Sequence, residues 1–412
     1  ARSKSVMDNP SFDDFGLRLL SNDLAKVPGK KAADTIHTQL EGKVQLVRWA
    51  HPVGSQEPSH IFVGSSKGRK SDLGVHGVDW DQFTATSKNE PLFPPSASLE
   101  YAGDLTSFCN PTDQAFFLVA NSFGYVSIQE LDEKALKQDI EEQKEMFDDE
   151  ELEEGMYGRQ RKRYPVLTAK IPFPVLHAKQ QSSVSRSPTP WRPHKTEITA
   201  LDMQHPNGKT ILSTSDNGDI HLTQIQRRDS PEKRSTKCPI TDAVWSSTGE
   251  IYTVGMGARI DKWDKRMELK ASSSFVKDSR MFTCCTLTEE ENTGTVATGS
   301  EEGAILIWDT RNMKLPLCTS EAHNGPVWRM MFSPEKPDIL VSCGEDGNII
   351  STDIHNLNGE GTITNIVARE FLSYNSVDIV DIDSERGWLV AGSDSGKIRF
   401  VNRDLIHGSD AD

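Results

Sequence analysis

Residues 322–350 read AHNGPVWRMMFSPEKPDILVSCGEDGNII and contain the clearest copy of an internal repeat. An apolar segment begins at Val327, a turn follows at Phe332-Ser333-Pro334, and a second apolar segment runs over Ile339-Leu340-Val341-Ser342. The turn Glu345-Asp346-Gly347-Asn348 and a third apolar segment complete the copy. Short apolar runs separated by Pro and Gly turns predict antiparallel strands at hairpin spacing.

The same pattern recurs along most of the chain. Six further copies run over Val44–Trp80, Leu105–Ile128, Ile198–Ile225, Ile240–Asp264, Met281–Asp309 and Val377–Val401. A unit of about 45 residues that cannot bury both faces alone predicts a β-propeller when it is repeated in this way. The sequence therefore predicts an all-β, seven-bladed propeller over residues 35–412.

A ring of blades has to close. Residues Thr35–Leu40 alternate as a strand and precede the first repeat. We predict that this N-terminal strand pairs with Lys397–Val401 and closes the last blade, because pairing would leave no free sheet edge.

Two regions lie outside the repeat. Residues 1–34 contain Ser11-Phe12-Asp13-Asp14, which has capping-box spacing, and then apolar residues at helical intervals. This extension predicts a short amphipathic helix, which either packs on its own propeller or docks on a partner. Residues 132–163 form a charged insertion, acidic and then basic, which predicts a solvated helix or a disordered segment. Val166–Ala169 is expected to follow it as the outer strand of the second blade.

Composition limits the classes of partner. The chain has 412 residues, with 46 Lys and Arg against 61 Asp and Glu, and a net charge of −15. Such a chain is not expected to bind nucleic acid directly, because phosphate binding requires a basic surface. Residues 1–34 sum to about +1 and residues 132–192 to about −1, so the acidity belongs to the propeller and favours basic or neutral protein partners.

Apolar runs and cysteines suggest a compartment. No apolar run approaches a membrane span of about 18 residues, and the first thirty residues lack the apolar core of a signal peptide. We therefore expect a soluble intracellular protein without membrane insertion. The six cysteines form no C-x-x-C pair, which predicts small buried thiols in strands, without disulfides.

One repeat contains the residue types of a catalytic triad, namely His323, Ser342 and Asp346. Ser342 lies within a strand-like segment and not at a G-x-S-x-G elbow, so we interpret the three as a structural hydrogen-bond network. The sequence has no P-loop, dinucleotide fingerprint or HExxH motif. The expectation is a non-enzymatic protein with no cofactor, no metal and no small-molecule substrate.

The rim of the central channel is the candidate partner site. In propellers of this type, the residue after the first apolar residue of each inner strand points to the rim. By register these residues are Gln45, Thr106, Thr199, Thr241, Phe282, Trp328 and Asp378. Phe282 and Trp328 fall on neighbouring blades and predict an aromatic hot spot, unless Trp328 packs sideways between blades.

Several motifs resemble a known family. Trp263-Asp264 and Trp308-Asp309 resemble the WD-repeat signature, and in that family a Trp completes the network of His323, Ser342 and Asp346, where this chain has Thr352. Residues 294–311 and 322–347 resemble repeats five and six of the small WD-repeat nucleoporin family, the forty-three class, of the Y-shaped nuclear pore subcomplex.

That resemblance implies an architectural subunit at the nuclear envelope. Its partners would be α-helical scaffold nucleoporins of the short arm of the Y complex. The resemblance also implies a role in protein and mRNA transport, and relocation to kinetochores in mitosis.

Other binding functions stay open. Two WDxR boxes end at Arg266 and Arg311 and resemble substrate receptors of cullin-RING ubiquitin ligases, in which this Arg contacts the ligase adaptor. The alternative is that each Arg pairs with a neighbouring carboxylate. A third reading is a histone-tail reader that uses Asp378 or Glu345. Ser187 and Thr189 precede prolines and are candidate phosphorylation sites.

Overall fold

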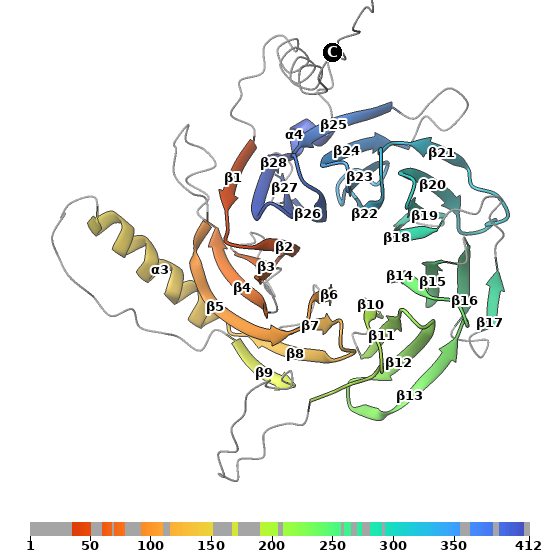
Figure 1. The fold of residues 1–412 in the computed structure, drawn as a ribbon, viewed down its shortest axis with the longest axis horizontal. Helices are drawn as coiled ribbons and strands as arrows, with labels where there is room; N and C mark the ends of the chain where they lie inside the picture. Colours follow the sequence, from red (N-terminus) through yellow and green to blue (C-terminus); the bar gives the residue numbers. More distant parts are fainter. Residues whose placement is uncertain are drawn as a thin grey trace, which may run out of the picture.

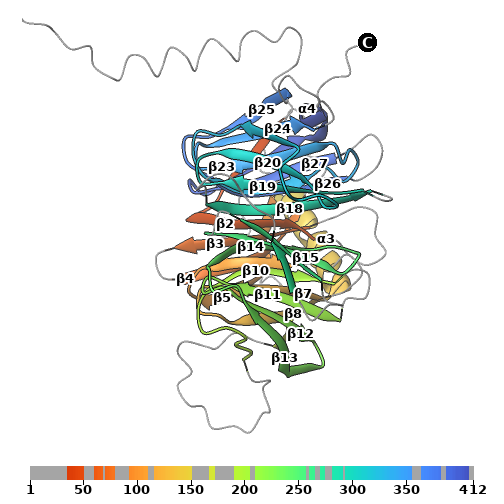
Figure 2. The same cartoon turned by 90° about the vertical axis from the view of Figure 1, so that its right-hand side faces the viewer.

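The protein is a ring of seven four-stranded antiparallel sheets around a central channel (Figure 1). Figure 2 shows the disc edge-on. This computed structural model describes residues 35–50, 60–67, 70–78, 92–109, 116–150, 167–171, 190–204, 209–256, 259–264, 270–273, 281–290, 293–354, 363–381 and 387–407. The predicted fold class, a seven-bladed propeller, is confirmed.

Six blades take their four strands in chain order, from the channel outward. Blade 1 consists of β2 (Lys43–Trp49), β3 (His60–Lys67), β4 (Lys70–Val78) and β5 (Leu92–Ala102). Blade 2 consists of β6 (Leu105–Cys109), β7 (Phe116–Asn121), β8 (Val126–Leu131) and β9 (Leu167–Ile171). Blade 3 consists of β10 (Ile198–Met203), β11 (Thr210–Ser215), β12 (Asp219–Gln224) and β13 (Arg227–Ser235). Blade 4 consists of β14 (Ile240–Trp245), β15 (Glu250–Gly255), β16 (Ile260–Asp264) and β17 (Lys270–Ser273). Blade 5 consists of β18 (Phe282–Glu290), β19 (Thr293–Ser300), β20 (Ala304–Asp309) and β21 (Cys318–Glu321). Blade 6 consists of β22 (Val327–Phe332), β23 (Ile339–Gly344), β24 (Asn348–Asp353) and β25 (Ile363–Arg369).

Blade 7 joins the two ends of the propeller. It combines β26 (Tyr374–Asp381), β27 (Gly387–Ser393) and β28 (Lys397–Asn402) with β1 (Thr35–Gln39) as its outer strand. β1 pairs antiparallel with β28, from Thr35 opposite Val401 to Gln39 opposite Lys397. The predicted closure by the N-terminal strand is confirmed.

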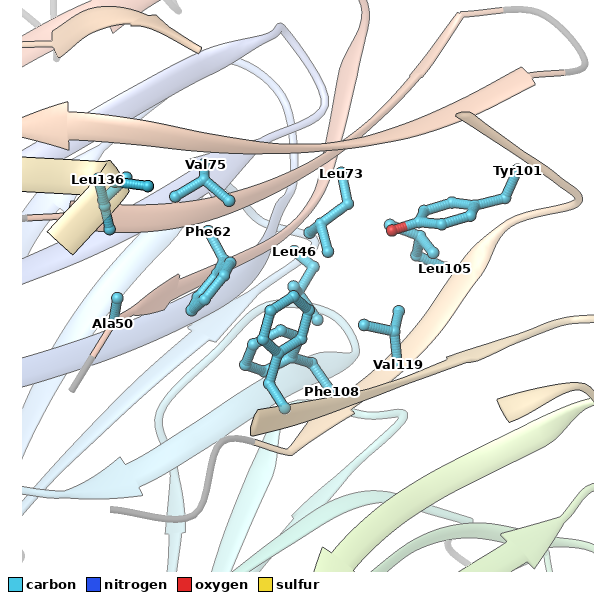
Figure 3. Packing of buried hydrophobic residues seen from close by; sticks show 12 residues of the cluster. Leu46, Ala50, Phe62, Leu73, Val75, Tyr101, Leu105, Phe108, Val119 and Leu136 are labelled. Carbon is cyan, nitrogen blue, oxygen red and sulfur yellow. The ribbon is translucent and has the colours of Figure 1, made fainter. Parts of the chain in front are cut away.

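The core consists of seven apolar layers, one at each junction between neighbouring blades. At the junction of blades 1 and 2, the ring centroids of Phe62 and Phe117 lie 4.5 Å apart, and those of Phe62 and Phe108 lie 5.0 Å apart. Figure 3 shows Phe62 and Leu46 beside Phe108 in this layer. Each blade therefore buries both of its faces only when both neighbours are present.

At two junctions between blades, close packing leaves room only for glycine in the second strand. A Cβ atom on Gly299 would lie 2.8 Å from Val327 of the next blade, and one on Gly392 would lie 2.4 Å from Val44. Real Cβ atoms do not approach side chains so closely, so any larger residue here would push the next blade away.

Within the described part of the charged insertion, residues 133–150 form a helix that is only partly solvated. α3 (Glu133–Glu150) lies outside the ring beside β5 (Figure 1), with Leu136 2 % exposed and Gln143 3 % exposed. Figure 3 shows Leu136 near Val75 of blade 1. The sequence predicted a solvated helix or disorder here, and the apolar contact of its first turn was not predicted. β9 then forms the outer strand of blade 2, as predicted.

Other elements add detail. A short helix, α4 (Arg403–His407), follows β28 and contacts blades 6 and 7.

Four of the six cysteines are buried, as expected of small thiols in strands: Cys109, Cys284, Cys285 and Cys343. Within the described parts of the chain, no helix combines the length and apolar character needed to cross a bilayer. The predicted N-terminal helix of residues 1–34 lies outside the described residues.

Because β1 closes blade 7, its removal should destabilise the whole propeller. A chain that begins at residue 42 should have a melting temperature on the order of 10 °C below that of a chain that begins at residue 35, because about five backbone hydrogen bonds and the cover over β28 are lost. Thermal unfolding followed by circular dichroism measures the difference. Equal melting temperatures for the two chains would refute the closing role of β1.

Candidate functional site

Every inner strand carries a β-bulge near its start, at its second or third residue. We call the face of the disc on which these strands begin the bulge face. The extra residues are Gln45, Thr106, Thr199, Thr241, Thr283, Trp328 and Asn375. Five of the seven predicted rim residues are in this set, while Phe282 and Asp378 are not.

Phe282 was predicted at the rim, and that prediction is wrong. Its side chain is fully buried, and its ring packs against Trp308 with centroids 6.4 Å apart and planes at 83°. The bulge in β18 falls one residue later, on Thr283, so Phe282 points into the layer between blades. Trp328 is 40 % exposed, so only one of the two aromatic residues reaches the surface.

Bulge residues connect each blade to the next one. The Thr241 hydroxyl donates to the carbonyl of Phe282 at 2.6 Å, and the Thr283 hydroxyl donates to the carbonyl of Val327. Thr241 also donates to its own blade, to the Val254 carbonyl at 3.2 Å. A short polar side chain at the bulge can therefore bridge two blades.

The same bridge occurs where the ring begins and ends. Asn375 of blade 7 donates from its amide to the carbonyl of Val44 in blade 1 at 3.1 Å. The Gln45 side-chain oxygen of blade 1 accepts from the backbone N–H of Leu105 in blade 2 at 3.2 Å. Four of the seven bulge residues thus clamp neighbouring blades together, whereas Thr199 bonds to Thr214 of its own blade and the Thr106 hydroxyl has no hydrogen-bond partner among the described residues.

Deeper in the channel, a second set of side chains accepts hydrogen bonds from the next blade. The Asp242 carboxylate accepts from the backbone N–H of Cys285 at 3.0 Å, and the Asp202 carboxylate accepts from that of Trp245 at 2.7 Å. Ser107 accepts from Leu201, and Ser376 accepts from Val47. These bonds fix the spacing of the inner strands.

Asp378 belongs to this deeper set. Its carboxylate accepts from the backbone N–H of Trp49 at 2.7 Å, across the junction of blades 7 and 1. The prediction that Asp378 points to the rim of the channel is wrong, because the bulge of β26 falls three residues earlier, at Asn375. Its carboxylate holds blade 1 in place.

A cavity of about 300 Å³ lies in the channel, lined by charged residues of several blades. Arg48 donates to Ser376 Oγ at 3.0 Å and to the carbonyls of Val47 and Val377, and burial together with Arg329 lowers its pKa to about 10. Arg329 Nη1 lies 3.6 Å from the Asp242 carboxylate. Burial raises the pKa of Asp242, and Arg329 with two backbone N–H groups only partly opposes it.

Asp242 is therefore a sensitive position. Asp242→Ala should lower the free energy of unfolding by about 3–5 kcal/mol, because it leaves the Cys285 N–H and the Arg329 guanidinium without their acceptor. Asp242→Asn keeps an oxygen acceptor, so its loss of unfolding free energy should be distinctly smaller. Denaturant unfolding of both variants measures the losses, and equal losses would contradict the role of this acceptor.

The residues of the triad type do come together. His323 Nε2 lies 2.8 Å from Ser342 Oγ, and His323 Nδ1 lies 3.0 Å from Asp346 Oδ1. Burial acts to raise the pKa of Asp346, but hydrogen bonds from His323, the Asn324 N–H and Asn348 outweigh it and hold this pKa below its ordinary value. The Ser342 side chain is fully buried, so substrate cannot reach its hydroxyl. The arrangement ties a turn to two strands.

Tryptophan completes two other blades, as in the family pattern. Trp308 Nε1 donates to Thr298 Oγ1 at 3.0 Å, and Trp263 Nε1 donates to Thr253 Oγ1 at 2.9 Å. In blade 6, Thr352 takes the place of the Trp, and its buried hydroxyl has no hydrogen-bond partner. The network of blade 6 is shorter, as the sequence predicted.

Blade 3 contains a pair of buried histidines. His194 Nε2 lies 2.9 Å from Ser213 Oγ, and the rings of His194 and His221 stack 4.1 Å apart at 17°. One ligand-type atom from each ring and one from Asp219 lie within 4.8 Å of one another. Because stacked rings direct their nitrogen lone pairs side by side, these atoms do not converge on one ion. We interpret the pair as a structural stack.

Burial of these rings predicts a pH dependence of stability. Burial and His221 lower the pKa of His194 from 6.5 to about 3, and burial and Lys233 lower that of His221. Below pH 6.5 the unfolded chain therefore binds more protons than the folded one, and stability falls as pH decreases. Between pH 7 and pH 5, the titration of His194 alone should lower the free energy of unfolding by about 2 kcal/mol.

The measurement is the melting temperature as a function of pH. His194→Gln together with His221→Gln should flatten its decline below pH 6.5 relative to the unsubstituted chain. An unchanged slope would show that neither ring titrates on unfolding.

The remaining predicted residues fall into two groups. Arg311 pairs with Asp309 through two nitrogens, at 2.8–3.2 Å, and its side chain is 64 % exposed on the face opposite the bulges. Arg266, Ser187 and Thr189 lie outside the described residues. Arg311 thus has the carboxylate partner that the alternative interpretation expected.

Sequence reasoning missed Thr283 and Asn375. Thr occupies the bulge position in four consecutive blades, at Thr106, Thr199, Thr241 and Thr283, and this recurrence was the signal that could have identified Thr283. No comparable recurrence marks Asn375.

Comparisons with known proteins agree with this architecture. The WD domain, G-beta repeat, family pattern matches residues 186–223 and 314–351. The chain is a seven-bladed β-propeller that contains WD repeats. It is similar to nucleoporin Nup43 of Homo sapiens, with 26 % identity over 156 residues, which cover 36 % of this chain and 41 % of that protein.

Two further similarities have comparable extent. The nuclear pore complex protein nup43 of Dictyostelium discoideum is 29 % identical over 175 residues, covering 38 % of this chain and 41 % of that protein. Diphthine methyltransferase of Homo sapiens is 27 % identical over 163 residues, covering 36 % of each chain. The chain thus matches about two fifths of the length of these Nup43 relatives.

Proposed function

We propose that this WD-repeat protein is a structural nucleoporin of the outer-ring scaffold, the Y complex, and acts by binding other proteins. The similarity to Nup43 proteins of three species carries the proposal. The architecture supports it, since side chains of the inner strands hold the ring rigid, as a scaffold subunit requires. The proposed partners are α-helical scaffold nucleoporins of the short arm.

We further propose that the protein is not an enzyme. Part of the chain resembles diphthine methyltransferase, so a catalytic function has to be weighed. Against it stands the burial of Ser342, whose hydroxyl is sealed between strands although its hydrogen bonds resemble those of a nucleophile. A serine that solvent cannot reach does not attack a substrate.

The location of the protein tests the scaffold function. Endogenously tagged protein should stain the rim of the nucleus together with a nuclear pore marker, and should co-purify with α-helical nucleoporins. A chain that begins at residue 42, without β1, serves as the control for a closed ring. Diffuse staining of the intact protein throughout interphase would refute the proposal. Imaging of the same cells in mitosis tests relocation to kinetochores, which belongs to the proposed role.

A further inference from the structure

Two segments of the chain share the sequence Ser-Pro-Glu-Lys. One copy is residues 230–233 and the other is residues 333–336. A serine directly before a proline, with a basic residue two positions after that proline, is the acceptor pattern of proline-directed protein kinases. Because the two copies have the same sequence, their structural surroundings decide whether a kinase can use them.

The copy in blade 6 is closed to a kinase. Ser333 follows β22 and is 1 % exposed. Its backbone N–H donates to the carbonyl of Ile339 at 2.8 Å, which ties the connection between β22 and β23 to its own blade. A kinase has to bring the serine hydroxyl in line with the phosphate of ATP, so a buried serine in a tied connection does not react.

The copy in blade 3 lies on the outer edge of the ring. β13 is the last strand of its sheet, and Figure 1 shows it at the periphery of the disc. Ser230 is exposed, and its hydroxyl makes no hydrogen bond within the part of the chain that the structure describes. The Ser230 hydroxyl is therefore accessible to an enzyme that approaches from outside the ring.

The strand ladder is interrupted at this serine. Arg227 and Glu232 both pair with residues of β12, but the four residues between them, 228–231, oppose the single residue Thr223. We call residues 228–231 the β13 bulge. Pro231 has no N–H to give to a ladder, which agrees with a bulge on an edge strand. The backbone around the serine is thus in the outer strand without a paired neighbour, and a kinase can bind it as a separate segment.

Basic side chains surround the β13 bulge. Residues 227–234 contain four basic and two acidic side chains, on a chain whose net charge is −15. Arg227, Arg228 and Lys233 make no ion pair with any described residue. Arg234, in contrast, lies 3.7 Å from Glu232. Three cations close in sequence to the serine are thus available to a phosphate group.

We propose that Ser230 is phosphorylated by a proline-directed protein kinase. Ser230 Oγ attacks the γ-phosphorus of ATP, the bond from this phosphorus to the β–γ bridging oxygen breaks, and ADP leaves. The hydroxyl proton passes to a carboxylate of the kinase and then to water. The exposed serine in the β13 bulge carries this proposal, which does not depend on the proposed scaffold function.

Phosphorylation would change the charge of the outer edge of blade 3. A phosphoserine carries a charge of about −1.5 to −2 at neutral pH, which cancels the excess of basic side chains in residues 227–234. Ion pairs that it forms on the exposed surface add little to stability. The modification therefore controls which charged partner this edge can bind and leaves the ring itself unchanged.

Site-resolved mass spectrometry of the folded, full-length protein tests the site. With ATP and a purified cyclin-dependent kinase, Ser230 should gain phosphate at least about a hundredfold faster than Ser333, because Ser333 reacts only when its blade opens. Equal rates at the two serines, or no phosphate on Ser230, would overturn the proposal.

Peptides separate the effect of structure from that of sequence. Synthetic peptides of residues 225–238 and 328–341 should react at rates within about fivefold of each other, because neither serine is buried in a peptide. A peptide of residues 328–341 that stayed unmodified, while the other reacted, would show that sequence selects the site and would overturn the argument from exposure.

Variants identify the class of kinase. Pro231→Ala should slow phosphorylation of Ser230 by about tenfold or more, whereas Arg227→Ala with Arg228→Ala, the matched control, should keep the rate within about threefold. The opposite result would indicate a kinase that recognises arginine before the serine and would overturn the proline-directed assignment. Circular dichroism melting of each variant verifies that the ring is folded.

The endogenous protein tests the site in cells. Protein isolated from dividing and from resting cells should yield a phosphopeptide that contains Ser230, and Ser230→Ala should remove it. Absence of this phosphopeptide from both populations of cells would overturn the proposal.

Discussion

Each blade of this ring has two apolar faces, and neither is buried until a neighbour packs against it. The seven apolar layers between blades therefore depend on one another, and the ring depends on the antiparallel pairing of β1 with β28. Without that pairing, blade 7 would have three strands and a free edge on β28. Closure by backbone hydrogen bonds makes the propeller one cooperative unit.

Hydrogen bonds between blades add to the cohesion that the apolar layers provide. Bulge residues such as Thr241 and deeper acceptors such as Asp242 direct their hydrogen bonds to the next blade and rarely outward. They satisfy backbone groups that a simple stack of sheets would leave unpaired in the channel. Part of the acidity of the chain is accordingly internal, because Asp202, Asp242 and Asp378 each accept a backbone N–H.

The fold was predictable because its signals are local. Apolar runs and Gly turns repeat with each blade, and the alternation of Thr35–Leu40 predicted the strand that closes the last blade. The direction of individual side chains near a bulge was not predictable by counting along the strand, because a bulge shifts the alternation by one residue. A bulge reverses the side-chain alternation, so a rim assigned by counting placed Phe282 outside when it packs against Trp308. The exposure of Phe371 depends on how Glu370 pins its loop, and no sequence period encodes that contact.

A scaffold propeller has to satisfy two demands at its rim. Clamps between blades require short polar side chains at the bulges, whereas partner binding requires large apolar ones. In blade 6 the bulge residue is the half-exposed Trp328, and the buried layer between blades 6 and 7, with Tyr374 and Val377, supplies the cohesion there. The cost of one missing clamp is small against a full apolar layer, because a single hydrogen bond contributes about 1 kcal/mol and each buried large side chain contributes more. A blade can therefore lack a clamp at its bulge, as the blades of Thr106, Thr199 and Trp328 do, without loosening the ring.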